Sequence, residues 1–189
     1  MLCNLLLWSF LILVGVGGCE SDPSRDELAR QLSLCDLAED NGITDAAVNA
    51  CGAALRIVEK GGYPANQVSE LSYRLGRLER QRRNFVTAEE LVLRSMAFPE
   101  ETGDRSATAA RLVELSFSLA GQGRWPDGAE VLERALPLTD ALGEKERRAA
   151  ANAFRAFGLR LARMDRERQA ERFLAQAEKL GGNAPEGDE

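Results

Sequence analysis

Cysteine is the residue type in this 189-residue chain that offers the most chemistry, and histidine, its usual catalytic partner, does not occur. The four cysteines are Cys3, Cys19, Cys35 and Cys51. Because Ser-His-Asp and Cys-His sites need an imidazole to take the proton, the composition excludes both, together with histidine-ligated zinc. The thiols are left with two roles, as sites of covalent modification and as partners in a disulfide.

The other ionisable residues form no catalytic constellation. None of the three lysines lies in an SxxK or GxxxxGK[ST] context, so the Ser-Lys nucleophile and the phosphate-binding loop are absent. Adjacent carboxylates such as Glu89 and Glu90 diverge on a helix, and Asp36, Glu39 and Asp40 lack the spacing of an EF-hand loop. The sequence therefore predicts a protein that is not an enzyme and has no cofactor, no metal site and no small-molecule substrate.

Nucleic acid is also not expected as a partner. A basic run between Arg74 and Arg83, with Tyr73 beside it, is the feature that could suggest one. The whole chain has 24 Lys and Arg against 30 Asp and Glu, for a net charge of −6. We therefore interpret the run as the solvated face of a helix.

The first 18 residues have the pattern of a targeting segment. They carry no charged side chain, and their apolar run from Leu5 to Val16 is shorter than a membrane span. Val16-Gly17-Gly18-Cys19 resembles a bacterial lipobox, in which two small residues precede the cysteine that is lipidated. The resemblance implies a lipoprotein signal peptide at 1–18, acylation (palmitate) of Cys19 and a lipidated linker at 19–23. An uncleaved membrane anchor is the alternative.

Both alternatives place the rest of the chain outside the cytoplasm or on a membrane surface. Glu20 follows Cys19, where an Asp would resemble the retention signal known in some bacteria. The expected location is thus the cell envelope, on the periplasmic side of the outer membrane if the organism has two membranes.

Apolar residues recur at intervals of three and four from Ser24 to Leu180, and glycine and proline interrupt them at regular places. The pattern repeats with a period near 40 residues. Small residues twelve apart, such as Gly76 and Ala88, or Gly158 and Ala170, predict where two helices of a hairpin cross closely. The expected helices are 24–40, 44–60, 64–82, 85–97, 104–121, 125–141, 144–164 and 167–180.

Residues 111–136 carry a nameable pattern: Gly123 at a turn, Trp125 opening a helix, then Gly128, Leu132 and Ala135. This pattern resembles a tetratricopeptide repeat (TPR). The resemblance implies an all-α, right-handed solenoid of about four antiparallel helix hairpins over residues 24–180, followed by a disordered acidic tail at 181–189. A generic helical bundle is the alternative fold.

Exported TPR lipoproteins serve in assembling pili, secretion channels and other envelope machinery. The resemblance therefore implies a protein-protein scaffold or adaptor. The alternative is an accessory or catalytic component of envelope metabolism with an unrecognised site.

The hairpin arrangement also bears on the two remaining thiols. Cys35 lies eight residues before a turn at Ile43, and Cys51 lies eight residues after it. Both thiols should sit at the same height on facing helices, so we predict a disulfide. Two buried free thiols are the alternative.

The concave face of such a solenoid is formed by the first helix of each hairpin. An apolar centre around Phe117 is predicted there, with arginines on both sides, which suits a protein or peptide partner that is acidic at its ends and apolar in the middle. The alternative is that these arginines solvate an outer face. The expected partner-binding residues are Tyr73, Arg77, Arg80, Val113, Phe117, Arg155, Leu159 and Arg163.

Overall fold

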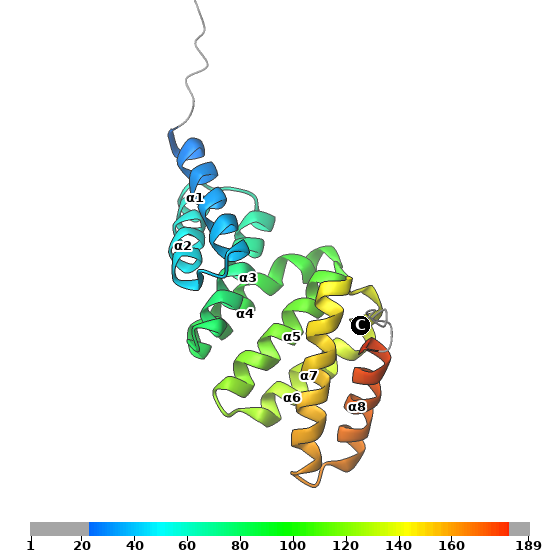
Figure 1. Ribbon diagram of the computed structural model, residues 1–189. Coiled ribbons are helices and arrows are strands. Elements are labelled where there is room, and N and C mark those ends of the chain that lie inside the picture. Colours follow the sequence, from blue (N-terminus) through cyan, green and yellow to red (C-terminus); the bar gives the residue numbers. More distant parts are fainter. Residues whose placement is uncertain (1–22, 182–189) are drawn as a thin grey trace, which may run out of the picture.

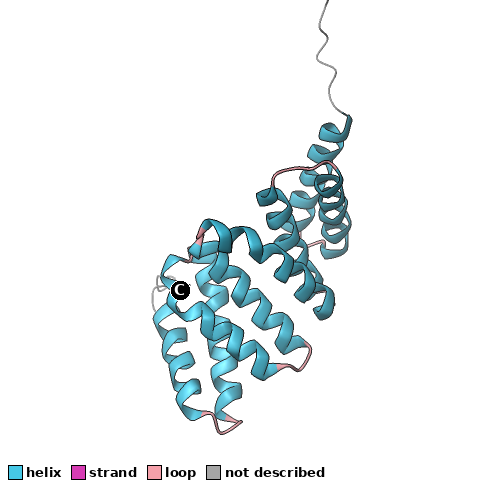
Figure 2. Cartoon of the chain, turned by 180° about the vertical axis from the view of Figure 1, so that it is seen from behind, coloured by secondary structure: helices cyan, strands magenta, loops and turns pink. Residues whose placement is uncertain are grey.

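The computed structural model describes residues 23–181, which form helices joined by short turns (Figure 1 and Figure 2). The elements are α1 (Pro23–Asp40), α2 (Thr44–Lys60), α3 (Ala65–Gln81), α4 (Phe85–Thr102), α5 (Arg105–Gly121), α6 (Trp125–Ala135), the 3₁₀ helix η1 (Leu136–Ala141), α7 (Glu144–Ala162) and α8 (Glu167–Gly181). Within this range there are eight α-helices and no strand, which confirms the all-α prediction. The predicted signal peptide at 1–18, the acylation site Cys19 and residues 182–189 lie outside the described residues.

Consecutive helices pair into four antiparallel hairpins, and each hairpin packs on the next along the chain (Figure 1). The hairpins begin at residues 23, 65, 105 and 144, in agreement with the period near 40. Contacts of α2 with α3 and of α4 with α5 join neighbouring hairpins. The chain is therefore a helical-hairpin solenoid, and no helix within residues 23–181 has the length and apolar character needed to cross a bilayer.

Small residues lie where the paired helices cross. A methyl group added to Gly76 would lie 3.3 Å from the carbonyl oxygen of Ala88. One added to Gly158 would lie 3.2 Å from the carbonyl oxygen of Ala170. The side-chain hydrogen of glycine is what lets the two backbones approach, so the predicted crossing points are confirmed.

Helix α4 continues to Thr102, beyond its predicted end at residue 97, before Pro99. A proline inside a helix leaves the carbonyl four residues earlier without its hydrogen bond. Here that carbonyl belongs to Ser95, and the hydroxyl of Ser69 on α3 donates to it at 2.7 Å. Because the freed acceptor is satisfied from a neighbouring helix, the chain remains helical through Pro99.

The buried apolar side chains form two clusters. One cluster fills the space among α1, α2 and α3, and includes Leu55 and Leu75. The other extends from α4 to α8 and contains three fully buried rings, Phe154, Phe157 and Phe173. Helices α3 and α4 pair as one hairpin, yet their buried residues belong to different clusters.

Candidate interaction site

A cavity of about 120 Å³ lies among α3, α5 and α7, three of the four first helices of the hairpins. The second half of α3 contributes Tyr73, Arg77 and Arg80, and the middle of α5 contributes Val113 and Phe117. The structure thus brings together five of the eight residues predicted to bind a partner. The other lining residues are Ala110, Glu114, Lys145, Glu146 and Ala149.

The remaining three predicted residues, Arg155, Leu159 and Arg163, lie on or just beyond the later turns of α7 and do not line this cavity. The predicted residues lie at the same height on each first helix of the repeat pattern. The cavity instead meets α7 in its first two turns, at Lys145 and Glu146. The cavity is therefore shifted toward the start of α7. The repeat pattern does not predict this shift, because the pattern does not determine the angle at which successive helices cross.

Two arginines of the cavity lie against aromatic rings. The Arg80 guanidinium lies 5.2 Å from the ring centre of Phe117 and forms an ion pair with the buried Glu114. The Arg77 guanidinium lies 5.8 Å from the ring centre of Tyr73. Each such cation-π contact contributes about 0.5–2 kcal/mol.

The charges of the cavity are only partly compensated. Within the described part of the chain, neither Arg77 nor Lys145 forms an ion pair with a carboxylate, in contrast to Arg80. Both line a second hollow as well, beside Glu39 and Asp40 at the end of α1. The site therefore presents two cations next to an apolar wall.

Tyr73 remains protonated over the whole physiological range. Burial raises the pKa of its hydroxyl to about 12, and the negative charge of Glu114 acts in the same direction. The phenol can therefore donate a hydrogen bond to an acceptor on an incoming molecule.

Arg111 of α5 packs against the ring of Tyr73. Arg111 was not among the predicted partner-binding residues. Its guanidinium lies 4.7 Å from the Tyr73 ring centre and donates hydrogen bonds to Ser69 at 3.3 Å and to Glu70 at 3.2 Å. Only 5% of Arg111 is exposed. Arg111 thus links α5 of the third hairpin to α3 of the second. Its position among buried apolar residues of α5 was the one sequence signal for this link.

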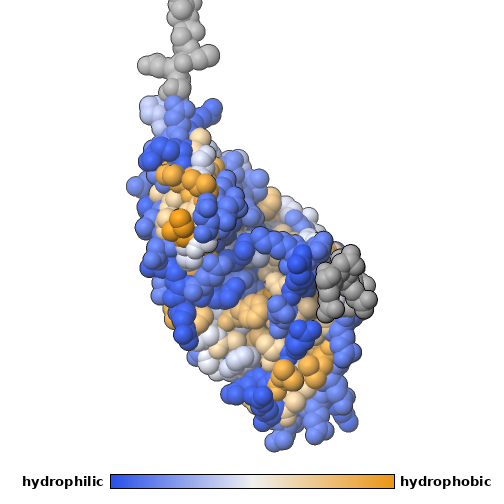
Figure 3. All heavy atoms as spheres, viewed as in Figure 1, coloured by the Kyte–Doolittle hydropathy of each residue, from blue (hydrophilic) through white to orange (hydrophobic). Residues whose placement is uncertain are grey.

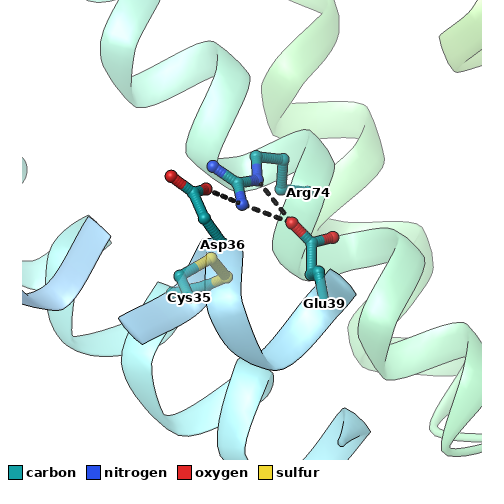
Figure 4. Close-up of a disulfide and its surroundings, with 5 residues drawn as sticks. Cys35, Asp36, Glu39 and Arg74 are labelled. Atoms are coloured by element: carbon teal, nitrogen blue, oxygen red, sulfur yellow. Dashed lines mark hydrogen bonds and ion pairs between the residues drawn. A yellow bond between two sulfur atoms is a disulfide. The ribbon is translucent and has the colours of Figure 1, made fainter. Parts of the chain in front are cut away.

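Cys35 and Cys51 are joined by a disulfide between α1 and α2, with their Cα atoms 5.1 Å apart (Figure 4). Their sulfur atoms and a carboxylate oxygen of Glu39 lie within 4.8 Å of one another, which is the spacing of metal ligands. The sulfurs are bonded to each other, however, and Arg74 donates to Glu39 at 2.9 Å and to Asp36 at 2.6 Å. The group is a cross-link within the first hairpin, held against α3 by ion pairs.

Three solved structures show what this architecture is similar to. BtubC (BKLC) from P. vanneervenii has a TM-score of 0.70 and 17% identity, over 90% of this chain and 70% of that one. MamA has a TM-score of 0.62 and 14% identity, over 82% and 78%. A Podosopora anserina kinesin light chain protein with nearly identical TPR-like repeats has a TM-score of 0.61 and 20% identity, over 90% and 82%.

No family model and no curated protein sequence matches the chain. The structural likeness, at identities of 14–20%, concerns the fold. TPR-like folds typically serve as non-catalytic scaffolds for protein-protein interaction, with the concave face open to a partner. With four stacked hairpins and small residues at their crossings, this chain has the fold of a TPR-like helical repeat protein.

Proposed function

We propose that the protein is a membrane-anchored scaffold of the bacterial cell envelope and binds a segment of another protein in the cavity among α3, α5 and α7. At about 120 Å³ the cavity is smaller than the roughly 300–1,000 Å³ of small-molecule sites and suits one side chain. The observation that carries the proposal is an apolar wall at Phe117 and Val113 beside two cations without a carboxylate partner in the described chain.

The partner segment has an apolar side chain with a carboxylate next to it. The apolar group enters beside Phe117, and the carboxylate reaches Arg77 and Lys145. Arginine binds a carboxylate through two parallel N–H groups, which favours acidic over neutral segments. Glu146 of α7 lines the same cavity and would repel a carboxylate, so the acidic group lies nearer to Arg77 than to Glu146.

Two variants test the cavity as the binding site. We expect Phe117→Ala and Arg77→Glu each to lower partner recovery at least about tenfold in affinity capture from envelope membranes, because each removes a central contact. Mass spectrometry quantifies the partner, and circular dichroism checks that helicity is kept. Arg56→Glu, on an exposed position of α2, makes the same charge change away from the cavity and should leave recovery unchanged.

If both folded variants recover the partner like the wild type, the cavity is not the binding site. A partner recovered equally by Arg56→Glu and lost with Arg77→Glu supports the proposal. The assembly served by such a scaffold is an envelope complex such as a pilus or a secretion system.

A lipid on Cys19 holds the scaffold at the membrane, on the periplasmic side of the outer membrane where two membranes exist. The lipobox-like Val16-Gly17-Gly18-Cys19 supports this anchor. A disulfide between Cys35 and Cys51 also fits an oxidising compartment outside the cytoplasm.

For the anchor, we expect Cys19→Ala to abolish incorporation of labelled palmitate and to leave an unprocessed precursor, because the acceptor thiol is gone. Cys3→Ala is the matched control and should be labelled and processed normally. Metabolic labelling followed by intact-mass analysis distinguishes the two. A Cys19→Ala protein that is still labelled and shortened would rule out the lipobox.

A further inference from the structure

The first hairpin has an uncharged apolar face that no other described part of the chain covers. A cavity of about 600 Å³ lies between α1 and α2, and three large apolar side chains stand on it, with Leu34 43%, Leu37 61% and Ile43 56% exposed. Figure 3 shows apolar surface gathered over this hairpin. We call it the N-end face; its other lining residues are Gln31, Ala38, Asn41, Ala46, Asn49, Ala50 and Ala53.

An end of a solenoid is the side on which a further hairpin would stack. Terminal hairpins of repeat proteins usually carry a polar outer face, because an apolar one associates with other molecules. None of the ten residues that line the N-end cavity is charged, in a chain where 29% of residues are. Four of the ten lining residues are alanines, and small side chains allow a packed helix to approach closely.

The last hairpin has an outer face of a different kind. Arg148, Asn152, Arg155 and Leu159 follow one another at intervals of three and four, and so form one stripe of α7. Leu159 is 51% exposed. Arg148, Asn152 and Arg155 line a hollow of about 200 Å³ that reaches Leu180 at the end of α8. Glu144 and Arg147 line it as well, and Glu144 forms an ion pair with Arg148 at 2.7 Å. We call this stripe and hollow the C-end face.

The two terminal hairpins carry opposite net charge. Residues 23–60 contain seven acidic and four basic side chains, whereas residues 144–181 contain six acidic and ten basic ones. Asp40 precedes Asn41 of the N-end face in the sequence, and Arg155 lines the hollow of the C-end face. Opposite net charge of the two terminal hairpins favours their association and sets its direction.

We propose that the N-end face of one copy of this protein stacks on the C-end face of a second copy, so that copies join head to tail. The contact repeats the hairpin-on-hairpin packing that already joins α2 to α3 and α4 to α5. Two N-end faces would instead bring two acidic hairpins together. An anionic lipid surface would repel the same acidic hairpin. A head-to-tail contact leaves one free face at each end, so the assembly grows by addition.

Sedimentation velocity of the whole chain in detergent tests the proposal. We expect the average mass of the wild-type particles to rise with protein concentration. The rise should be smaller at about 0.5 M salt than at about 0.05 M, because salt screens the attraction between the two charged hairpins. Leu37→Glu and Leu159→Glu should each abolish the rise. The double variant gives the baseline for association through the lipid anchor alone.

The decisive sample is an equimolar mixture of Leu37→Glu and Leu159→Glu. One variant keeps an intact C-end face and the other an intact N-end face, so the mixture should form heterodimers that grow no further. Val86→Glu and Leu93→Glu, on α4 at 60% and 50% exposure, are controls matched to Leu37 and Leu159 and should associate like the wild type.

Three outcomes would overturn the proposal. The wild type could keep the mass of the double variant at every protein concentration, which would show that the two faces do not bind each other. Leu159→Glu alone could still form dimers, which would mean a symmetric contact between N-end faces. The mixture could fail to form heterodimers although the wild type associates, which would place the contact elsewhere.

Discussion

Removing the disulfide by the double substitution Cys35→Ala and Cys51→Ala is expected to lower the free energy of unfolding of the first hairpin by about 3 kcal/mol. The bridge closes a loop with a sequence separation of 16, so it removes many extended conformations from the unfolded chain. Both sulfur-bearing side chains are fully buried between α1 and α2. Replacing both residues, and not one, avoids leaving a free thiol that could pair with another chain.

The loss should be local. The first hairpin contributes to the cluster shared with α3, whereas α7 and α8 belong to the other cluster. Amide hydrogen exchange should therefore accelerate in α1 and α2 and stay nearly constant in α7 and α8, which serve as a reference within the same sample. Equal acceleration in both regions would show that the cross-link stabilises the whole domain cooperatively.

Gly128→Val is expected to destabilise the third and fourth hairpins by about 3 kcal/mol, the upper part of the usual range for overpacking. A methyl group at Gly128 would lie 2.8 Å from Cζ of Phe157 and 3.0 Å from the carbonyl oxygen of Ser116. The Phe157 ring is buried and lies against Trp125, with ring centres 5.0 Å apart, and the carbonyl belongs to α5. Neither neighbour can move without disturbing a packed helix.

Gly52→Ala provides the matched control for this prediction. The added methyl group would lie 3.5 Å from a terminal nitrogen of Arg56 and 3.9 Å from a methyl carbon of Leu75, which are ordinary contacts. Alanine is also a better helix former than glycine, by about 0.5–1 kcal/mol. Urea unfolding should thus show opposite signs for the two variants, and a tolerated Gly128→Val would disprove the close crossing of α5 and α6.

Much of the fold could be predicted because it depends on local and repeated signals. Apolar periodicity and glycine turns located the helices, and small residues twelve apart, such as Gly76 and Ala88, located the crossings. The path of α4 through Pro99 could not be predicted, because the hydroxyl that satisfies the freed carbonyl comes from Ser69 on another helix. Ser69 lies 26 residues before Ser95, so no local sequence pattern connects the two residues.

The cavity was predictable on α3 and α5 and not on α7. Tyr73 and Phe117 could be placed because the apolar periodicity of the sequence shows which face of α3 and of α5 is buried. The presence of Lys145 in the cavity depends on where α7 crosses α5. That position results from the packing angles of three successive hairpins. Arg111 was missed because its partners Ser69 and Glu70 belong to a different hairpin.

The cross-link between Cys35 and Cys51 has a mechanical consequence. If the chain is tethered through Cys19, a pull between the membrane and a bound partner enters the domain at α1. The force passes from residue 35 directly to residue 51, so the intervening segment carries no tension. That segment would otherwise add about 55 Å of slack, at roughly 3.4 Å per extended residue. A first hairpin pulled in this way would therefore extend less than one without the cross-link.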